Sequence, residues 1–382
     1  MNEARVYADG FERSFAEVKD LLEFLAERGR NAKWIRKPTN TLRLAPLEKE
    51  AQNLDAADAS MEEILEDTEK NTQLVLKMRG ESYPVRDCAI RTILSRAGVN
   101  GDGLRKLDKA TYAKVVNYCL RVAKGDALIK IADGKVSAVH GGGDKHDYCI
   151  LDMKAMFETT CEYLNLNFKG SVYMEGSGIY DHSIVSAMWK LGGSQELLDT
   201  YRKALDAHGM DEKILSPALR FTTSDVAASG ANLYPMLLTD GPNGVISLGS
   251  PIKLAHDKGG ATILDFRKNL EQVCARYVDA MKNLTQLMDI EIRNPVNCLK
   301  LLMKELGIKQ KIRNEVVELF VSQNGGEGAC TAHDLYYAMN EASFFAACEG
   351  MSGQGILKLE EDITKALIKD WKKYDVYGAV KC

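Results

Sequence analysis

Two short runs of β-prone residues on either side of an Asp-Gly pair constrain the fold of this 382-residue chain more than any other feature. Ala127–Ile131 leads into Asp133-Gly134, and Lys135–Val139 leads back out. This pattern predicts a β-hairpin, because an Asp-Gly turn matches the twist of the two strands that it joins. An isolated hairpin is only marginally stable in water, so further strands must complete its sheet. Residues 170–175 and 219–254 are the candidates, and we expect them to share one sheet with the hairpin.

Helical periodicity dominates the rest of the chain. Residues 60–124 are predicted to be helical, with breaks at Glu81–Pro84 and Asn100–Gly103. The longest helical pattern begins at Ile263 and continues for about seven turns. We expect one buried apolar stripe on this helix, formed by Phe266, Leu270, Val273, Tyr277, Met281 and Leu284. The predicted fold class is α+β, mostly helical, with a mixed or antiparallel sheet that contains the hairpin at residues 127–139.

Charge and proline divide the chain into three predicted segments. Residues 1–55 are expected to hold an N-terminal helix, a basic segment and an extended linker that contains Pro38 and Pro46. Residues 56–260 are predicted to form an α+β core domain, and residues 261–382 a helical C-terminal region packed on that core. Nine acidic residues and one lysine lie between Leu44 and Glu69, directly after the basic segment. Positive and negative charge are therefore segregated early in the chain.

Composition and cysteine spacing indicate a globular protein of a reducing compartment. Hydrophobic residues make up 45% of the chain, an ordinary value for a protein that buries a substantial core. Nine cysteines are scattered without a CxxC pair, so a disulfide framework is not expected. The N-terminus lacks a signal-peptide pattern, and no apolar run approaches the ~20 residues that span a bilayer. We therefore expect a cytoplasmic protein without a membrane partner.

Two histidines and a cysteine within ten residues raise the question of a metal site. Zinc accepts the side chains of His140, His146 and Cys149, and Cys330 and His333 could supply further ligands. Their spacing matches none of the usual structural zinc patterns, and glycines between the histidines favour a plain connection after the hairpin. We therefore predict no metal site and no cofactor.

No catalytic signature is present in the sequence. The run Gly141–Lys145 lacks the spacing and the following Ser or Thr of a phosphate-binding P-loop. No serine lies in a GxSxG nucleophile elbow. Catalytic residues therefore stay unknown, and an enzyme whose site is assembled from distant residues is one alternative.

A basic segment between residues 28 and 43, free of acidic residues, is the most suggestive local feature. Arginine and lysine neutralise phosphates, and a tryptophan ring can stack on a base. The net charge of -4 argues against a non-specific coat of nucleic acid, but not against a local patch. In the alternative interpretation, the basic segment lies against the acidic segment that follows it. The predicted site for DNA or RNA consists of Arg28, Arg30, Lys33, Trp34, Arg36, Lys37 and Arg43.

Four short motifs follow one another along residues 60–368. They are Ala89–Gly98 with Asn117–Leu120, Asp133–Val139 with Tyr148–Asp152, Leu219–Asp225 with Ile252–Leu254, and Thr331–Asn340. Their order resembles a phage/plasmid-like family of unknown function, in which a Trp occupies the position of His333. The resemblance implies a protein of a mobile genetic element and no particular reaction.

Three classes of function follow from these features. The first is a non-enzymatic phage or plasmid accessory protein that associates with nucleic acid in replication or recombination. The second is an inhibitor of a host defence system, which would bind a host or phage protein and imitate nucleic acid with its acidic surface at Glu48–Glu69. The third is an enzyme with an unrecognised site. A homo-oligomer is compatible with each class.

Overall fold

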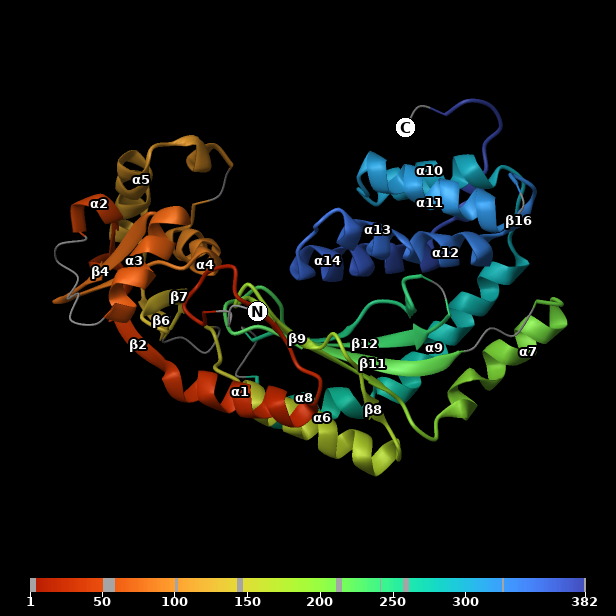
Figure 1. Ribbon diagram of the computed structural model, residues 1–382, viewed down its shortest axis with the longest axis horizontal. Coiled ribbons are helices and arrows are strands. Elements are labelled where there is room, and N and C mark those ends of the chain that lie inside the picture. Colours follow the sequence, from red (N-terminus) through yellow and green to blue (C-terminus); the bar gives the residue numbers. More distant parts are fainter. Residues whose placement is uncertain are drawn as a thin grey trace.

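The computed structural model describes residues 5–50, 59–99, 102–142, 147–210, 215–240, 242–256, 261–324 and 326–380. Figure 1 shows two lobes. The small lobe comprises residues 32–142, and the large lobe comprises residues 12–31 and 147–380. Each lobe is packed around its own main apolar cluster. Antiparallel sheets combined with many helices confirm the predicted α+β class.

Two three-stranded antiparallel sheets form the small lobe, with strand orders β2-β6-β7 and β3-β4-β5. A parallel bridge between Val85 and Val136 joins the two sheets. The strands are β2 (Ala32–Pro38), β3 (Arg43–Pro46), β4 (Leu74–Met78), β5 (Glu81–Pro84), β6 (Asp126–Ala132) and β7 (Lys135–Gly141). The longer helices are α3 (Ala59–Lys70), α4 (Asp87–Ala97), which packs on β7, and α5 (Lys109–Val122), which packs on β3.

The predicted hairpin is confirmed as β6 and β7. Asp133 and Gly134 both have positive φ values, +50° and +75°, as a two-residue turn of the hairpin type requires. The prediction that this hairpin shares a sheet with residues 170–175 and 219–254 is wrong. Strand β2 pairs with β6 along its whole length and completes the sheet, while those later segments belong to a separate sheet in the large lobe.

The first hundred residues depart from the sequence predictions in three further ways. The expected extended linker at residues 38–46 is mostly paired backbone, because it includes the end of β2 and all of β3. The expected boundary near residue 55 falls inside the small lobe, since β3 pairs with β4 across it. Residues 74–84 form β4 and β5 instead of helix, because a short apolar run such as Leu74–Met78 fits either structure until its neighbours are known.

An eight-stranded antiparallel sheet is the framework of the large lobe. Its main order is β1-β9-β10-β11-β12-β13, with β8 beside β10 and β14 beside β12. The strands are β1 (Glu12–Ser14), β8 (Val172–Tyr173), β9 (Gly178–Tyr180), β10 (Ile184–Lys190), β11 (Ser216–Thr223), β12 (Ala231–Leu238), β13 (Val245–Ser247) and β14 (Ile252–Leu254). Strand β1 forms one edge of this sheet by pairing with β9. Residues 12–14 and residues 178–180 are thus neighbours in the large lobe although they are far apart in the sequence.

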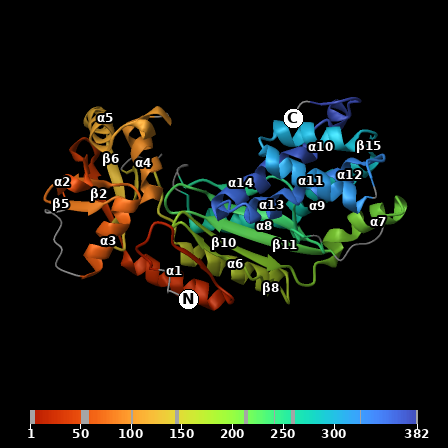
Figure 2. The same cartoon turned by 45° about the horizontal axis from the view of Figure 1, so that its top comes forward.

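Helices cover both faces of this sheet (Figures 1 and 2). One layer contains α1 (Val18–Asn31), α6 (Met153–Asn167), α7 (Asp199–Ala207), α8 (Ile263–Glu271) and α9 (Val273–Gln286). The other contains α10 (Pro295–Glu305), α11 (Gln310–Gln323), α12 (Ala332–Asn340), α13 (Ala342–Cys348) and α14 (Gly353–Thr364). The predicted C-terminal helical region therefore shares one core with the sheet.

The predicted long helix is two consecutive helices, α8 and α9, that meet at Gln272. A capping box of Thr262 and Asp265 fixes the start of α8. All six residues of the predicted stripe are buried, so the stripe is confirmed even though the helix is interrupted. In the described part of the chain, no helix combines the length and the apolar character needed to cross a membrane.

Candidate nucleic-acid interface between the lobes

The predicted basic segment forms the end of α1, the whole of β2 and the start of β3. Strand β2 is an edge strand, paired on one side with β6. Lys33 and Arg36 are exposed along it and Lys37 is half-buried, while Arg30 is exposed in the last turn of α1. The half-buried Arg43 donates to the backbone carbonyls of Asn40 and Leu42, at 2.7 and 2.6 Å. The backbone of β2 is thus paired with β6, and Arg30, Lys33 and Arg36 point their charge toward solvent. Part of the acidic segment, residues 51–58, lies outside the described residues.

Arg28 does not lie on this surface. Its guanidinium is buried and faces Asp225 of the large lobe at 3.3 Å, and it donates to Nδ1 of His182 at 3.0 Å. Lys130 of β6 pairs with the same carboxylate. Burial alone would raise the pKa of Asp225, but the charges of Lys130 and Arg28 lower it well below its ordinary value. Arg28 lies on α1 of the large lobe, so the ion pair that joins the lobes at this cluster is that of Lys130 with Asp225. Buried Arg28 takes no part in the exposed basic surface.

A second buried ionic cluster joins the lobes through residues 5–11. The carboxylate of Asp9 accepts hydrogen bonds from Nζ of Lys135 and from the backbone N–H of Asp87, each at 2.8 Å. The neighbouring carbonyl of Ala8 accepts from Nε2 of His182 in the large lobe at 3.0 Å. Because Nδ1 of His182 accepts from Arg28, this ring is neutral, and burial lowers the pKa of His182 well below its ordinary value. The inter-lobe junction, meaning these two clusters, is therefore ionic.

Four aromatic rings stack beside the junction. Tyr148 lies 3.8 Å from His140 and 5.2 Å from His256, measured between ring centroids, with interplanar angles of 5° and 4°. Trp34 stacks on the same group, 6.0 Å from His140 and 5.9 Å from Tyr148. Trp34 is half-buried, so part of its ring stays accessible. The sequence singled out Trp34 and His140, but it gave no signal for Tyr148 or His256 in this role.

His140 serves the stack as a neutral ring. Burial lowers its pKa to about 4, and its Nε2 donates to the backbone carbonyl of Asp225 at 3.2 Å. Cys149 lies near this stack, where its backbone N–H donates to the carbonyl of His256, and His146 lies outside the described residues. Across the residues that the structure describes, no group of three or more His, Cys, Asp or Glu side chains is placed to hold a metal ion.

A cavity of about 420 Å³ opens beside the stack, between the two lobes. His140, Tyr148 and His256 form one wall, and Arg91 and Arg96 of α4 form another. Arg96 donates from Nε to the hydroxyl of Thr39 at 2.7 Å, directly after β2. Arg91 is exposed and makes no hydrogen bond or ion pair with another described residue. The inter-lobe cleft thus offers a guanidinium beside an aromatic stack.

Arg91 also lines a second inter-lobe cavity, of about 630 Å³. Asp9, Asp87 and Asp181 lie on its walls, together with Arg105 and Lys109. Burial raises the pKa of Asp87 and that of Asp181, so neither carboxylate is strongly stabilised in its charged form. Among the described residues, the first cavity has two guanidinium groups and the single carboxylate of Asp147 on its walls, whereas the second has three cations and three carboxylates. An anionic ligand is therefore favoured more in the first cavity than in the second.

The first two of the four sequence motifs line this cleft, and the third supplies Asp225 to the neighbouring junction. Arg91 and Arg96 belong to the first motif, Tyr148 to the second and Asp225 to the third. Residues far apart in the chain thus meet at one site, which a local spacing rule cannot show. Comparison of the chain with protein-family models, with curated proteins and with solved structures finds no match.

Proposed function

We propose that this chain is a non-enzymatic accessory protein of a mobile genetic element that binds single-stranded nucleic acid at the inter-lobe cleft. The observation that supports it is the placement of Arg91, Arg96 and three rings of the stack around one cavity, next to the exposed basic residues of β2. Guanidinium groups neutralise phosphates and aromatic faces stack on bases, which together suit an unpaired strand. The assignment to a mobile element rests on the motif resemblance.

The size of the cleft favours an unpaired strand over a duplex. Its two cavities, about 420 and 630 Å³, fall within the range of roughly 300–1,000 Å³ that is typical of small-molecule sites. A nucleotide with its phosphate suits such a volume, whereas an intact duplex would have to lie outside on β2. The interior of the cleft holds neutral rings, and His140 stays neutral above a pH of about 4, so it acts as a surface for stacking and not as an acid or base.

A gel-shift assay on labelled single- and double-stranded DNA and RNA at low salt tests this function. The double variant Arg36→Ala, Lys37→Ala should weaken binding about equally across sequences, because phosphate contacts carry no base information. Arg276→Ala with Lys282→Ala is the matched control, since both residues are exposed on α9 in the large lobe. No shift by wild-type protein at micromolar concentration would sink the proposal.

The inhibitor of a host defence system is the second candidate, and helix α3 favours it. Glu62, Glu66 and Glu69 are exposed at spacings of four and three, so they form one acidic stripe toward solvent. Glu63 and Asp67 lie on the neighbouring face, where Arg5 and Lys135 pair with them at 2.9 and 2.5 Å. Charge reversal at Glu62 and Glu66 should abolish capture of a protein partner and leave nucleic-acid binding intact.

A further inference from the structure

A separate cavity of about 490 Å³ lies in the large lobe, at the end away from the small lobe. It is enclosed by α7, the ends of α11 and α12, and the connection between β12 and β13. Leu205, Leu215, Ile246 and Phe320 are buried and supply an apolar floor. We name this cavity the far-end pocket. None of its lining residues contributes to the inter-lobe cleft, so it is independent of the proposed function.

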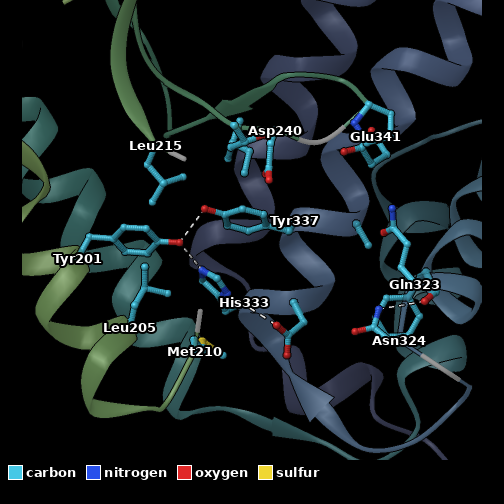
Figure 3. Close-up of a pocket in the computed structure, with 16 residues that line it drawn as sticks. Tyr201, Leu205, Met210, Leu215, Asp240, Gln323, Asn324, His333, Tyr337 and Glu341 are labelled. Atoms are coloured by element: carbon cyan, nitrogen blue, oxygen red, sulfur yellow. Dashed lines mark hydrogen bonds and ion pairs between the residues drawn. The ribbon is translucent and has the colours of Figure 1, made fainter. Parts of the chain in front are cut away.

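Three polar side chains meet at the inner wall of the far-end pocket (Figure 3). The hydroxyl of Tyr201, from α7, lies 2.6 Å from Nε2 of His333 and 2.7 Å from the hydroxyl of Tyr337. Tyr201 and His333 are buried, at 1% and 5% exposure. Two helices that are distant in the sequence thus present one hydrogen-bonded group, which the fourth sequence motif supplies in large part.

The two tyrosines act here as neutral phenols. Burial raises the pKa of Tyr201 and that of Tyr337 far above the ordinary value, so neither forms a phenolate at neutral pH. Each phenol has one proton, and Tyr201 can therefore donate to only one of its two partners. When it donates to His333, Tyr337 donates to Tyr201, and the oxygen of Tyr337 then offers acceptor lone pairs. A nucleophilic role for Tyr201 is therefore disfavoured, and ligand binding is favoured.

The charges around the far-end pocket have one sign. Asp240, Asp334 and Glu341 line it, and no Lys or Arg occurs among its described lining residues. Burial opposes ionisation of Asp334, but hydrogen bonds from His333 and Thr331 hold its pKa below the ordinary value. Glu341 accepts from the backbone N–H of Asn243 at 2.8 Å. A phosphate or carboxylate ligand would meet three like charges here, whereas a cation would meet three opposite ones.

We propose that the far-end pocket binds an organic cation, an amine on an apolar or aromatic body. The carboxylates attract the ammonium group, and the rings of Tyr201, Tyr337 and Phe320 offer faces for cation–π contact. The apolar floor covers the body of the ligand, and the phenol of Tyr337 supplies a hydrogen-bond partner. Cavities of this type, apolar with a few convergent polar groups, are the usual form of small-molecule sites.

Isothermal titration calorimetry with three probes of one shape tests this proposal. Tyramine is a cation, 4-ethylphenol is neutral and 3-(4-hydroxyphenyl)propionate is an anion. Tyramine should bind with a Kd of about 1 mM or tighter, given its few non-hydrogen atoms. The anionic probe should bind at least about tenfold more weakly, because like charges in a binding site are strongly unfavourable. Equal binding of the three probes, or none, would overturn the proposal.

Two variants and a control locate the binding. Tyr337→Phe should weaken tyramine binding by roughly 3- to 10-fold, through the loss of one hydrogen bond. Asp240→Asn, at the exposed rim, should weaken it by about 2- to 5-fold at low salt. Asp279→Asn removes an exposed carboxylate from α9 and should change nothing. Melting curves confirm that each variant is folded. Loss of binding in Asp279→Asn, or unchanged binding in both pocket variants, would place the amine elsewhere.

Discussion

The inter-lobe junction and the far-end pocket are two places where polar side chains gather inside this protein, and they differ in charge and in burial. At the junction, Asp225 is enclosed with Arg28 and Lys130, and the exposed Arg91 lines the neighbouring cavity. In the far-end pocket, two phenols and a histidine sit behind a rim of carboxylates. The first arrangement suits a phosphate and the second an amine, so the two sites are expected to bind ligands of opposite charge.

The lobes themselves show the same division. Residues 32–142 carry nineteen Lys and Arg against fifteen Asp and Glu, and the rest of the chain carries thirty-one against thirty-nine. The net charge of -4 is therefore the sum of a positive lobe and a negative remainder. Whole-chain charge gave no reason to expect a basic cleft, because the excess on one lobe is masked by the other.

The largest expected contrast comes from the same substitution at the two sites. Asp225→Asn leaves Lys130 and Arg28 buried without a counter-charge, and it should lower the free energy of unfolding by about 3–5 kcal/mol. Asp240→Asn changes an exposed carboxylate and should stay within about 0.5 kcal/mol of wild type. Urea denaturation measures both. Equal midpoints for Asp225→Asn and wild type would mean that the ionic junction does not stabilise the fold.

The next prediction concerns His140 beside the junction and the pH dependence of the free energy of unfolding. Burial lowers the pKa of His140 to about 4 from 6.5, so between these pH values the unfolded chain binds a proton that the folded chain does not. Stability should therefore fall as the pH is lowered through this window. His140→Phe keeps a ring in the stack and should remove up to about 3 kcal/mol of that fall.

His182 and His208 serve as internal references for this measurement. The lowered pKa of His182 acts in the same direction and persists in the His140→Phe variant. Hydrogen bonds to the carbonyl of Ala204 and to Asp289 raise the pKa of the exposed His208, which opposes the fall. Denaturation curves at pH 4.5, 5.5 and 6.5 check the result. An unchanged pH slope in His140→Phe would show that this ring is not the titrating group.

A smaller contrast separates base stacking from ring packing at Trp34. If a base stacks on the accessible part of this ring, Trp34→Ala should weaken single-strand binding by about 1–3 kcal/mol and affect duplex binding less. The same variant loses contacts with His140 and Tyr148, so its stability must be measured in parallel. Equal losses for single strands and duplexes would assign Trp34 to the fold alone.

Local sequence signals predicted the parts of the fold that are locally determined. Asp133-Gly134 specifies its own turn, and the stripe from Phe266 to Leu284 follows from helical spacing. The basic segment gives no sign of a strand, because Lys33, Arg36 and Lys37 lack the spacing of two and resemble a solvated segment until β6 is known as its partner. Residues 32–38 form a strand because they pair with residues 126–132, about a hundred positions later in the chain.

The candidate sites are harder to predict from the sequence, because they too are built from residues that are far apart in the chain. Arg28, Lys130 and Asp225 come from three distant elements, and nothing in their spacing indicates an ion pair. The spacing of His140, His146 and Cys149 raises only the question of a metal site, whereas in the structure the ring of His140 stacks on Tyr148. The motif around His333 pointed to a special segment but gave no chemistry until Tyr201 was placed beside it.

The central claim, that phosphates are bound at the inter-lobe cleft, is tested most directly by the salt dependence of binding. Fluorescence anisotropy with a labelled single-stranded oligonucleotide is measured over a range of salt for wild type, Arg91→Ala and Arg276→Ala. Arg91 makes no hydrogen bond or ion pair with another described residue and Arg276 is exposed on α9, so neither change should disturb the fold. The log–log slope should become shallower by about 0.7 for Arg91→Ala, one released phosphate contact, and stay unchanged for Arg276→Ala. Identical slopes for all three proteins would contradict the account.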